Sequence, residues 1–397
     1  MIKEIVRLRI NGKPQDDLVP DITEIAVDES VDRADVVKLN LAVTRRIDGT
    51  WTLIDEPRFG MWNRLTVEAG YPSDTQILFD GYLTNAVVGF SVDDDPYLEV
   101  SGSDASALMD LSHHQETWPG KADHEIARKV FGSYGLSTVV EETLAQQTEQ
   151  VATTIQSDSD IRFLRRLARR NGFECRVRAG VGHFHRADLS SAPQKLLAMG
   201  YGSEANLESL TVMVDGTPAT APSISRVDPV TKQVDTKTLK DLPELQLGAD
   251  TLSKLRKDLP EGAVLVTRRA PSSSAEMEGW LRAEQTRAGR FVNVHGMIDS
   301  RAYRGVLRTG LPVTIKSVGE RYSGRYYVHH VVHTFTVDGY RQSFEASRNA
   351  LGVTGTENFA PPGLVPIAPG APGVSRRSGN RVLPEFQTHI VLPGARR

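Results

Sequence analysis

Residues Thr153–Val177 read TTIQSDSDIRFLRRLARRNGFECRV, the most informative stretch of the chain. A polar lead-in runs into a helical pattern, and an alternating segment follows Asn171-Gly172. Ser157 is a good N-cap residue, and Asp160 three positions later resembles a capping box. Gly172 can adopt the left-handed conformation that commonly ends a helix. The stretch therefore predicts a short helix that begins after Ser157, ends at Gly172 and leads into a strand.

The predicted helix has two unlike faces. Its apolar residues recur at helical spacing, and the remaining positions carry a stripe of arginines. The stripe has three interpretations: a solvated face paired with local carboxylates, a surface for a protein partner, or a phosphate-binding surface. Nucleic acid would require base-stacking aromatic residues or a wider basic surface, and neither is evident. The apolar residues are Ile161, Leu164, Leu167 and Ala168, and the arginines are Arg162, Arg165, Arg166, Arg169 and Arg170.

Composition limits the class of protein. A length of 397 residues predicts two to four domains, and 33 glycines with 21 prolines favour β structure with many turns. The formal net charge of −3 does not imply bulk attraction to nucleic acid. The single cysteine, Cys175, excludes an internal disulfide framework and a cysteine-based zinc cluster. Its place in an alternating segment favours a plain buried residue.

No apolar run approaches the roughly 20 residues needed to span a bilayer. The N-terminal residues MIKEIVRLRING are strand-like and lack the apolar segment of a signal peptide. We therefore expect synthesis in the cytoplasm and no direct insertion into a membrane.

The pattern along the chain predicts a mainly β protein with an α+β insertion. Strand patterns parted by Gly, Pro and Asp fill residues 1–102 and indicate a first β-barrel domain. A small α+β module is expected at 103–190, followed by a second β-barrel domain at 191–350 with a polar insertion near 228–262. Residues 351–397 are rich in Pro and Gly and are expected to form an extended tail.

Individual elements can be placed within these divisions. Asp338-Gly339 is a strong hairpin signal between two alternating segments. Helices are expected at 105–111, 123–131 and 275–288, with a weaker one at 251–259, and a strand pair is expected at 173–178 and 182–186. In the tail, residues 386–392 resemble a strand added to a neighbouring protein, with Phe386, Ile390 and Leu392 as its apolar contacts.

The sequence contains only weak evidence for metal-binding or catalytic sites. His183 and His185 would share one side of a strand, but no H-E-x-x-H motif or further cysteine supports a metal site. Asp93-Asp94-Asp95 is explained by a turn more simply than by calcium. No G-x-S-x-G, Walker-type or dinucleotide motif is present. We therefore predict no catalytic, cofactor or metal residues.

Two parts of the chain carry a resemblance to a known family. The word order D-x-x-F-L-x-R-L-x-x-x-x-G at 160–172 resembles the hub region of VgrG and phage late control protein D proteins, which are central baseplate hubs of contractile tails and injection machines. No β-helical needle repeats follow Asn349, so the resemblance covers the hub half alone. The C-terminal positions that match are Gly296, Leu307, Gly310, Val313, Ile315, Gly324, Tyr326, Val328, Val332, His333, Phe335, Phe344, Arg348 and Asn349.

The resemblance implies a structural protein without enzymatic activity or cofactor. Such a hub is a homotrimer in which each chain contributes two similar barrels, and the resulting pseudo-sixfold ring adapts a sixfold inner tube to a threefold spike. The implied partners are the spike protein, the inner tube protein and other baseplate proteins, including a LysM-type component; nucleic acid is not among them. His333 falls on a family position, where a packed structural histidine is favoured. The alternatives are a tail-associated peptidoglycan hydrolase and a cell-wall-binding module.

Overall fold

The computed structural model describes residues 4–72, 74–144, 153–200, 204–228, 231–240, 244–259, 263–265, 274–357 and 359. The chain divides into two units, 1–361 and 362–397, and the second lies outside the described residues. The predicted tail strand at 386–392 is therefore outside them too. All that follows concerns the first unit.

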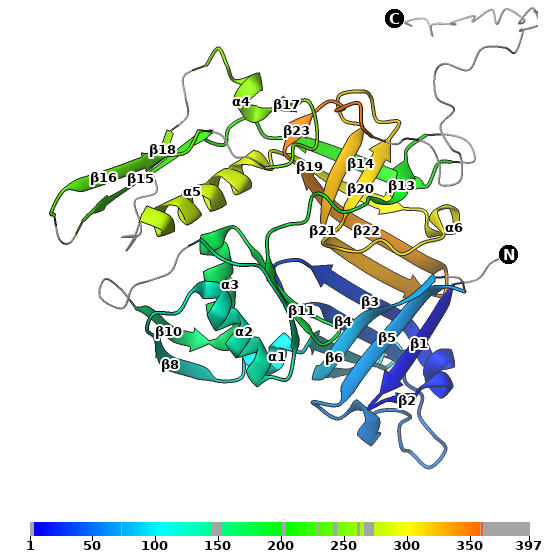
Figure 1. Cartoon of the computed structure of the whole chain (residues 1–397). Helices are drawn as coiled ribbons and strands as arrows, with labels where there is room; N and C mark the ends of the chain where they lie inside the picture. Colours follow the sequence, from blue (N-terminus) through cyan, green and yellow to red (C-terminus); the bar gives the residue numbers. More distant parts are fainter. Residues whose placement is uncertain are drawn as a thin grey trace, which may run out of the picture. The chain divides into compact units, whose positions relative to one another are not determined.

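A large sheet dominates the first unit (Figure 1). The described residues place 13 strands in it, mostly antiparallel, which confirms the mainly β prediction. Across the sheet they are β14 (Leu207–Val214), β19 (Val292–Ile298), β22 (Gly339–Arg348), β21 (Gly324–Thr336), β3 (Ile22–Ser30), β4 (Val36–Ala42), β7 (Tyr97–Asp104), β6 (Asp74–Gly89), β5 (Arg64–Tyr71), β1 (Ile5–Ile10) and β2 (Lys13–Pro14), with β20 (Pro312–Lys316) on β21 and β13 (Gln194–Ala198) on β20.

The N-terminal and C-terminal β regions share this one sheet. Strands β3 and β21 pair antiparallel from Ser30 opposite His330 to Glu24 opposite Thr336. The sequence pattern did not predict this pairing, since it joins segments about 300 residues apart. Each region has its own apolar core, although Phe335 from β21 packs with the core of the first region. The predicted hairpin at Asp338-Gly339 is confirmed, because it connects β21 to β22.

A small helical module interrupts the sheet in sequence, as predicted (Figure 1). Its helices pack around a separate core that includes Trp118, Phe131, Phe163 and Phe184. Cys175 lies in that core, which confirms the buried cysteine. The elements are α1 (Ser106–Met109), β8 (His113–Trp118), α2 (Asp123–Ser133), β9 (Ser137–Val140), β10 (Thr154–Ser159), α3 (Asp160–Asn171), β11 (Glu174–Arg178) and β12 (Val181–His185).

The helix of the opening stretch begins later than its sequence suggests. Ser159, not Ser157, is the N-cap of α3, and no side chain caps its first turn. Residues 154–159 pair with β8 as strand β10, where the buried Gln156 accepts a hydrogen bond of 3.3 Å from the Trp118 indole. The polar lead-in is therefore a strand. Gly172 ends the helix at φ +67°, as predicted.

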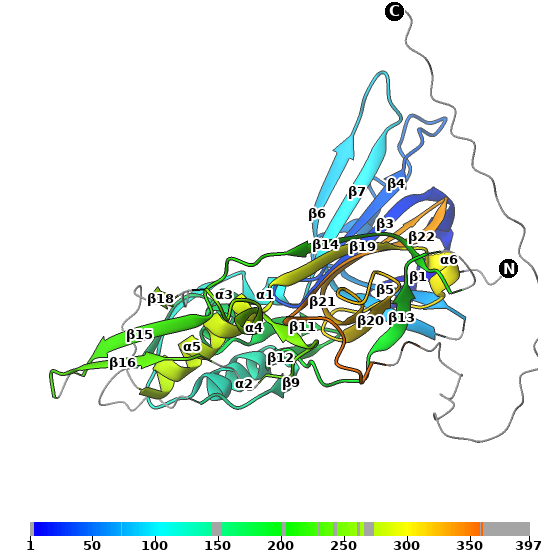
Figure 2. The same cartoon turned by 90° about the horizontal axis from the view of Figure 1, so that it is seen from above.

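Of the predicted polar insertion near 228–262, strand β16 belongs to a small sheet that lies beside α5 (Ser274–Gly289) (Figure 2). Strands β15 (Ala221–Val227), β16 (Val234–Thr238) and β18 (Ala263–Leu265) make a three-stranded sheet. Ile224 packs there against Met277 and Trp280 of α5, whose predicted span is confirmed. The helix expected at 251–259 is a single turn. The remaining elements are α4 (Leu252–Leu255), α6 (Ser300–Tyr303), β17 (Asp250–Thr251) paired with β23 (Ala350–Leu351), and the 3-10 helices η1 (Asp16–Asp21) and η2 (Pro57–Phe59).

A buried charge cluster lies where the two β regions meet the module. The fully buried Glu29 carboxylate of β3 contacts Arg308 at 3.0 Å and Arg178 of β11 at 3.4 Å. His333 Nε2 lies 3.7 Å from the same carboxylate. Burial raises the pKa of Glu29, but the two arginines and His333 more than offset it and hold that pKa below its ordinary value. Glu29 is therefore ionised at neutral pH.

Glu29→Gln should lower the free energy of unfolding by about 3 kcal/mol, because the buried Arg308 loses its carboxylate partner and Arg178 keeps only Asp35, at 3.1 Å. Urea unfolding followed by tryptophan fluorescence would measure this. Glu68→Gln is the matched control, since Glu68 pairs with Arg7 at the surface and its loss should cost less than about 1 kcal/mol. Equal effects of the two substitutions would contradict the importance of the cluster.

His333 should make stability depend on pH. Burial lowers its pKa to about 4, so the folded protein keeps the ring neutral where an unfolded histidine is protonated. Its contribution is present above pH 6.5 and is lost as the pH falls toward 4. His333→Gln, which keeps a side-chain amide near the Tyr340 hydroxyl, should therefore lose about 2 kcal/mol less than the wild type between pH 7 and pH 5.

The test compares how much unfolding free energy wild type and His333→Gln each lose between pH 7 and pH 5. The pH dependence of the wild type alone is not sufficient. Burial and the charge of Asp35 raise the pKa of Asp104 to about 6, which stabilises the fold as the pH falls over part of the same range. Parallel pH profiles for wild type and His333→Gln would show that His333 does not titrate as inferred.

Candidate partner interface

Helix geometry gives the five arginines of α3 different surroundings. At about 100° per residue, Arg162 and Arg169 lie at the centre of an arc, with Arg165 at one edge and Arg170 at the other. Arg162 and Arg169 are exposed, whereas Arg165, Arg166 and Arg170 are partly buried. The stripe is therefore not one uniform solvated face.

Arg170 holds the module together. Its Nε donates to Asp123 of α2 at 2.6 Å, and its Nη1 lies 3.8 Å from Glu276 of α5. The neighbouring Asn171 amide also donates to Asp123 at 2.6 Å. Since Asp123 is buried, this guanidinium neutralises a carboxylate that would otherwise be costly. Arg170 thus joins three helices and is not available to a partner.

Arg162 and Arg166 are satisfied by nearby groups. Arg162 pairs with Asp110 at 2.9 Å, as expected for an arginine paired with a local carboxylate. Arg166 donates to the backbone oxygen of Ile155 at 3.0 Å, and its guanidinium lies over the Phe163 ring at 5.3 Å. Phe163 belongs to the buried face of α3, which the sequence pattern did not include.

Arg165 and Arg169 differ from the other three. The Nε and Nη2 atoms of Arg165 are buried and have no hydrogen-bond partner. Arg165 is one of the residues that line a concave surface of about 340 Å³ between the module and the first β region. The exposed Arg169, one helical turn further on, has no ion pair within the described part of the chain. The residues that line this concave surface with Arg165 include Ala34, Thr84, Ser103, Asp110, Leu111 and Ile161.

The histidines occupy structural positions. His183 Nδ1 lies 3.3 Å from His185 Nε2, and burial lowers the pKa of His183 to about 3. Within the described ranges, no group of three or more His, Cys, Asp or Glu residues is arranged to hold a metal ion. His333 is fully buried and hydrogen-bonds to the Tyr340 hydroxyl at 2.7 Å, which confirms a packed structural histidine.

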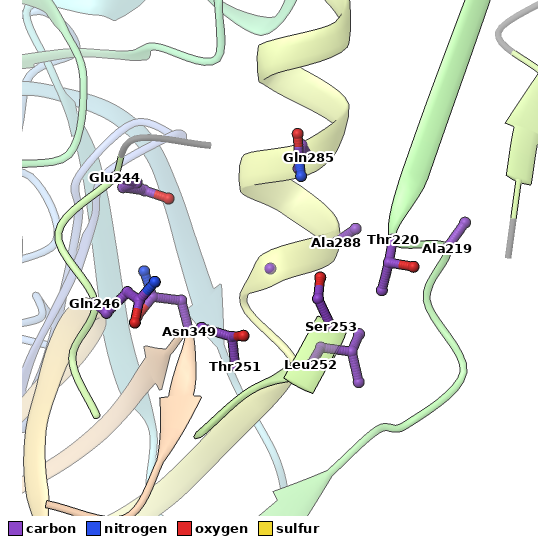
Figure 3. A pocket seen from close by; sticks show the side chains of 11 residues that line it. Ala219, Thr220, Glu244, Gln246, Thr251, Leu252, Ser253, Gln285, Ala288 and Asn349 are labelled. Carbon is purple, nitrogen blue, oxygen red and sulfur yellow. The ribbon is translucent and has the colours of Figure 1, made fainter. Parts of the chain in front are cut away.

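A separate cavity of about 90 Å³ lies between the C-terminal end of α5 and the turn of α4 (Figure 3). Among the described residues that line it, Glu244 is the one ionisable group, beside Gln246, Asn349 and Gln285. Burial raises the pKa of Glu244, and Arg290 opposes that rise. Glycosidases generally use a pair of carboxylates, and the lining of this cavity does not supply one.

The groups that complete the arginine contacts were not predicted from the sequence. Asp123 begins the predicted helix 123–131, where an acidic residue is ordinary. The sequence did indicate that Glu29 is buried, since Glu29 continues the alternation of the inward-facing Ile25 and Val27 in β3. A carboxylate on an apolar face predicts a buried cation but does not identify it.

Comparisons with solved structures place the fold among tail proteins. A 43 kDa tail protein of prophage MuSo2 from Shewanella oneidensis matches with a TM-score of 0.65 and 13% identity, covering 88% of this chain and 100% of that chain. A tail protein from Neisseria meningitidis MC58 matches with a TM-score of 0.61 and 15% identity, covering 88% and 98%. The predicted resemblance is therefore confirmed at the level of the tail-protein fold.

A third similar structure is an E. coli component of the type VI secretion system that is described as structurally similar to the T4 tail proteins gp27 and gp5. Its TM-score is 0.51 and its identity 12%, with 87% of this chain and 76% of that chain covered.

A family model described as the Alg8 N-terminal domain matches residues 4–336, and the chain belongs to that family. No curated protein matches its sequence. None of the described helices has the length and apolar character required to span a membrane.

Arg170→Met should lower the free energy of unfolding by about 3 kcal/mol, since it strands the buried Asp123 carboxylate. Arg169→Met is the matched control on the same helix and should change stability by no more than about 0.5 kcal/mol. Thermal or urea unfolding of the two variants would compare them. A stable Arg170→Met protein would contradict the structural assignment of Arg170.

Proposed function

We propose that this chain is a structural baseplate hub of a phage tail or contractile injection system. The observation that carries the proposal is the fold: a Shewanella oneidensis prophage tail protein matches along its entire length, and both β regions belong to one sheet. The hub motif at 160–172 supports it independently, since its apolar positions build α3 and its glycine ends that helix.

The proposed hub is a homotrimer in which the β regions at 1–102 and 191–350 act as the two barrel domains of each chain, flanking the module at 103–190. Three chains would form a pseudo-sixfold ring that joins the inner tube to the spike. Sheet-edge pairing between subunits is one way to close such a ring, and β14 lies at an edge with the exposed apolar residues Met213 and Val214. Baseplate proteins, including a LysM-type component, would surround it.

The proposed function is non-enzymatic. The described residues of the cavity beside α5 offer a single carboxyl group, and the similar structures are those of tail proteins. The proposed location is an assembled tail particle, reached after synthesis in the cytoplasm. The tail at 351–397, with Phe386, Ile390 and Leu392, is proposed to lie on the spike or a neighbouring baseplate protein.

Co-expression with a spike protein and a tube protein from the same genome tests the proposal. We expect a complex that contains three copies of this chain, measured by light scattering and by threefold averaging in electron microscopy. Removal of residues 362–397 should keep the trimer and weaken spike capture, because it leaves the first unit whole, including the hydrogen bond from Lys316 to the Phe359 backbone oxygen. A chain that stays monomeric and binds neither partner would refute the hub assignment, and clearing of a cell-wall suspension by the purified chain would favour the hydrolase.

A further inference from the structure

The unpartnered Arg165 guanidinium borders the concave surface next to α1. Its Nε and Nη2 atoms are buried and have no hydrogen-bond acceptor, so no carboxylate among the described residues is hydrogen-bonded to these two atoms. Asp110, also in the lining, is already engaged by Arg162 and Ser159, so its charge is largely offset. Leu111 is 60% exposed at the rim. The surface therefore suits a group that is acidic and partly apolar.

The hairpin between β6 and β7 carries such a group. Strand β6 is 16 residues long, and its residues 85–88 are all exposed, so neither of its faces is covered there. Figure 2 shows this hairpin extending away from the remaining strands. Its tip holds Asp93, Asp94 and Asp95, all exposed and without an ion pair to any described residue. Phe90 and Val92 beside them are 59% and 102% exposed.

The tip cannot reach the Arg165 surface of its own chain. Thr84 lines that surface and lies five residues before Gly89, where the paired part of the hairpin ends. At about 3.3 Å per residue, the aspartates lie beyond Gly89 and more than about 16 Å along the strand from Thr84. The pairing of β6 with β7 keeps them there, so an occupant of the surface has to come from another molecule.

We propose that the acidic β6–β7 tip of one copy docks against the Arg165 surface of a second copy. Each chain carries both halves, so the contact is head-to-tail, and repetition of such a contact closes a ring when three rotations return to the first copy. The aspartates would face the charges of Arg165 and the exposed Arg169, while Phe90 and Val92 cover the exposed Leu111. The proposal rests on the proposed homo-oligomeric hub and names the surfaces that join its subunits.

Thiol cross-linking tests the contact, since the native Cys175 is buried. Full-length Asp94→Cys and Leu111→Cys proteins, each made separately, are mixed and treated with a short bifunctional thiol reagent. We expect a covalent mixed dimer that forms at least about tenfold faster than from Leu111→Cys with Asp338→Cys, whose cysteine sits on another exposed hairpin turn. A yield no greater than that control overturns the contact.

A charge exchange gives the second test. Arg165→Glu added to the Leu111→Cys protein alone, or Asp93→Lys with Asp95→Lys added to the Asp94→Cys protein alone, should reduce the cross-link at least about tenfold. Both changes together, the combined variant, should recover it. Loss without recovery in a folded combined variant overturns the charge pairing. The mass of the wild-type chain is measured separately: a trimer without the cross-link refutes this contact and leaves the hub intact, whereas a wild type that is monomeric with all partners present refutes the hub.

Discussion

The fold depends on one buried negative charge. Glu29 lies where β3 meets β11 and the segment before β20, and an isolated carboxylate there would cost several kcal/mol. Its two guanidinium partners come from Arg178 and Arg308, far along the chain. The charge is stable only when all three segments are in place, so the cluster selects the arrangement in which both β regions and the module meet. Hydrophobic burial alone would not distinguish this junction from a shifted one.

The arginines of α3 show how helix geometry separates roles among identical side chains. Arg170 reaches sideways into a junction of three helices and neutralises Asp123, whereas Arg169 points to solvent one residue earlier. Arg165 lies at the other edge of the arc, where its Nε and Nη2 atoms are buried and have no hydrogen-bond acceptor. A stripe that looks uniform in the sequence therefore contains a structural cation, two locally satisfied cations and two that remain available.

The sequence predicted those features of the fold that depend only on neighbouring residues, such as helix ends and tight turns. Gly172 ends α3 because it can adopt positive φ, and the turn at Asp338-Gly339 closes its hairpin by its own conformation. Residues 154–159 could not be assigned, because their strand is formed by pairing with β8, and Ser157 alone looks like a cap. The β3–β21 pairing and the partners of Glu29 were likewise out of reach. Alternation shows which side of a strand is buried but not which distant segment covers it.

The described part of the chain keeps its internal charges apart from those on its periphery. Glu29 pairs with Arg178 and Arg308 inside, and Asp35 also pairs with Arg178, so strong coupling there favours a single arrangement. Asp93–Asp95 and Arg169 lie outside, where solvent weakens each pair, so charge there contributes more to orientation and encounter rate than to affinity. Lasting contact would need apolar cover in addition. Phe90 and Val92 stand beside the aspartates, and Leu111 stands near Arg165, so apolar side chains accompany both charged surfaces.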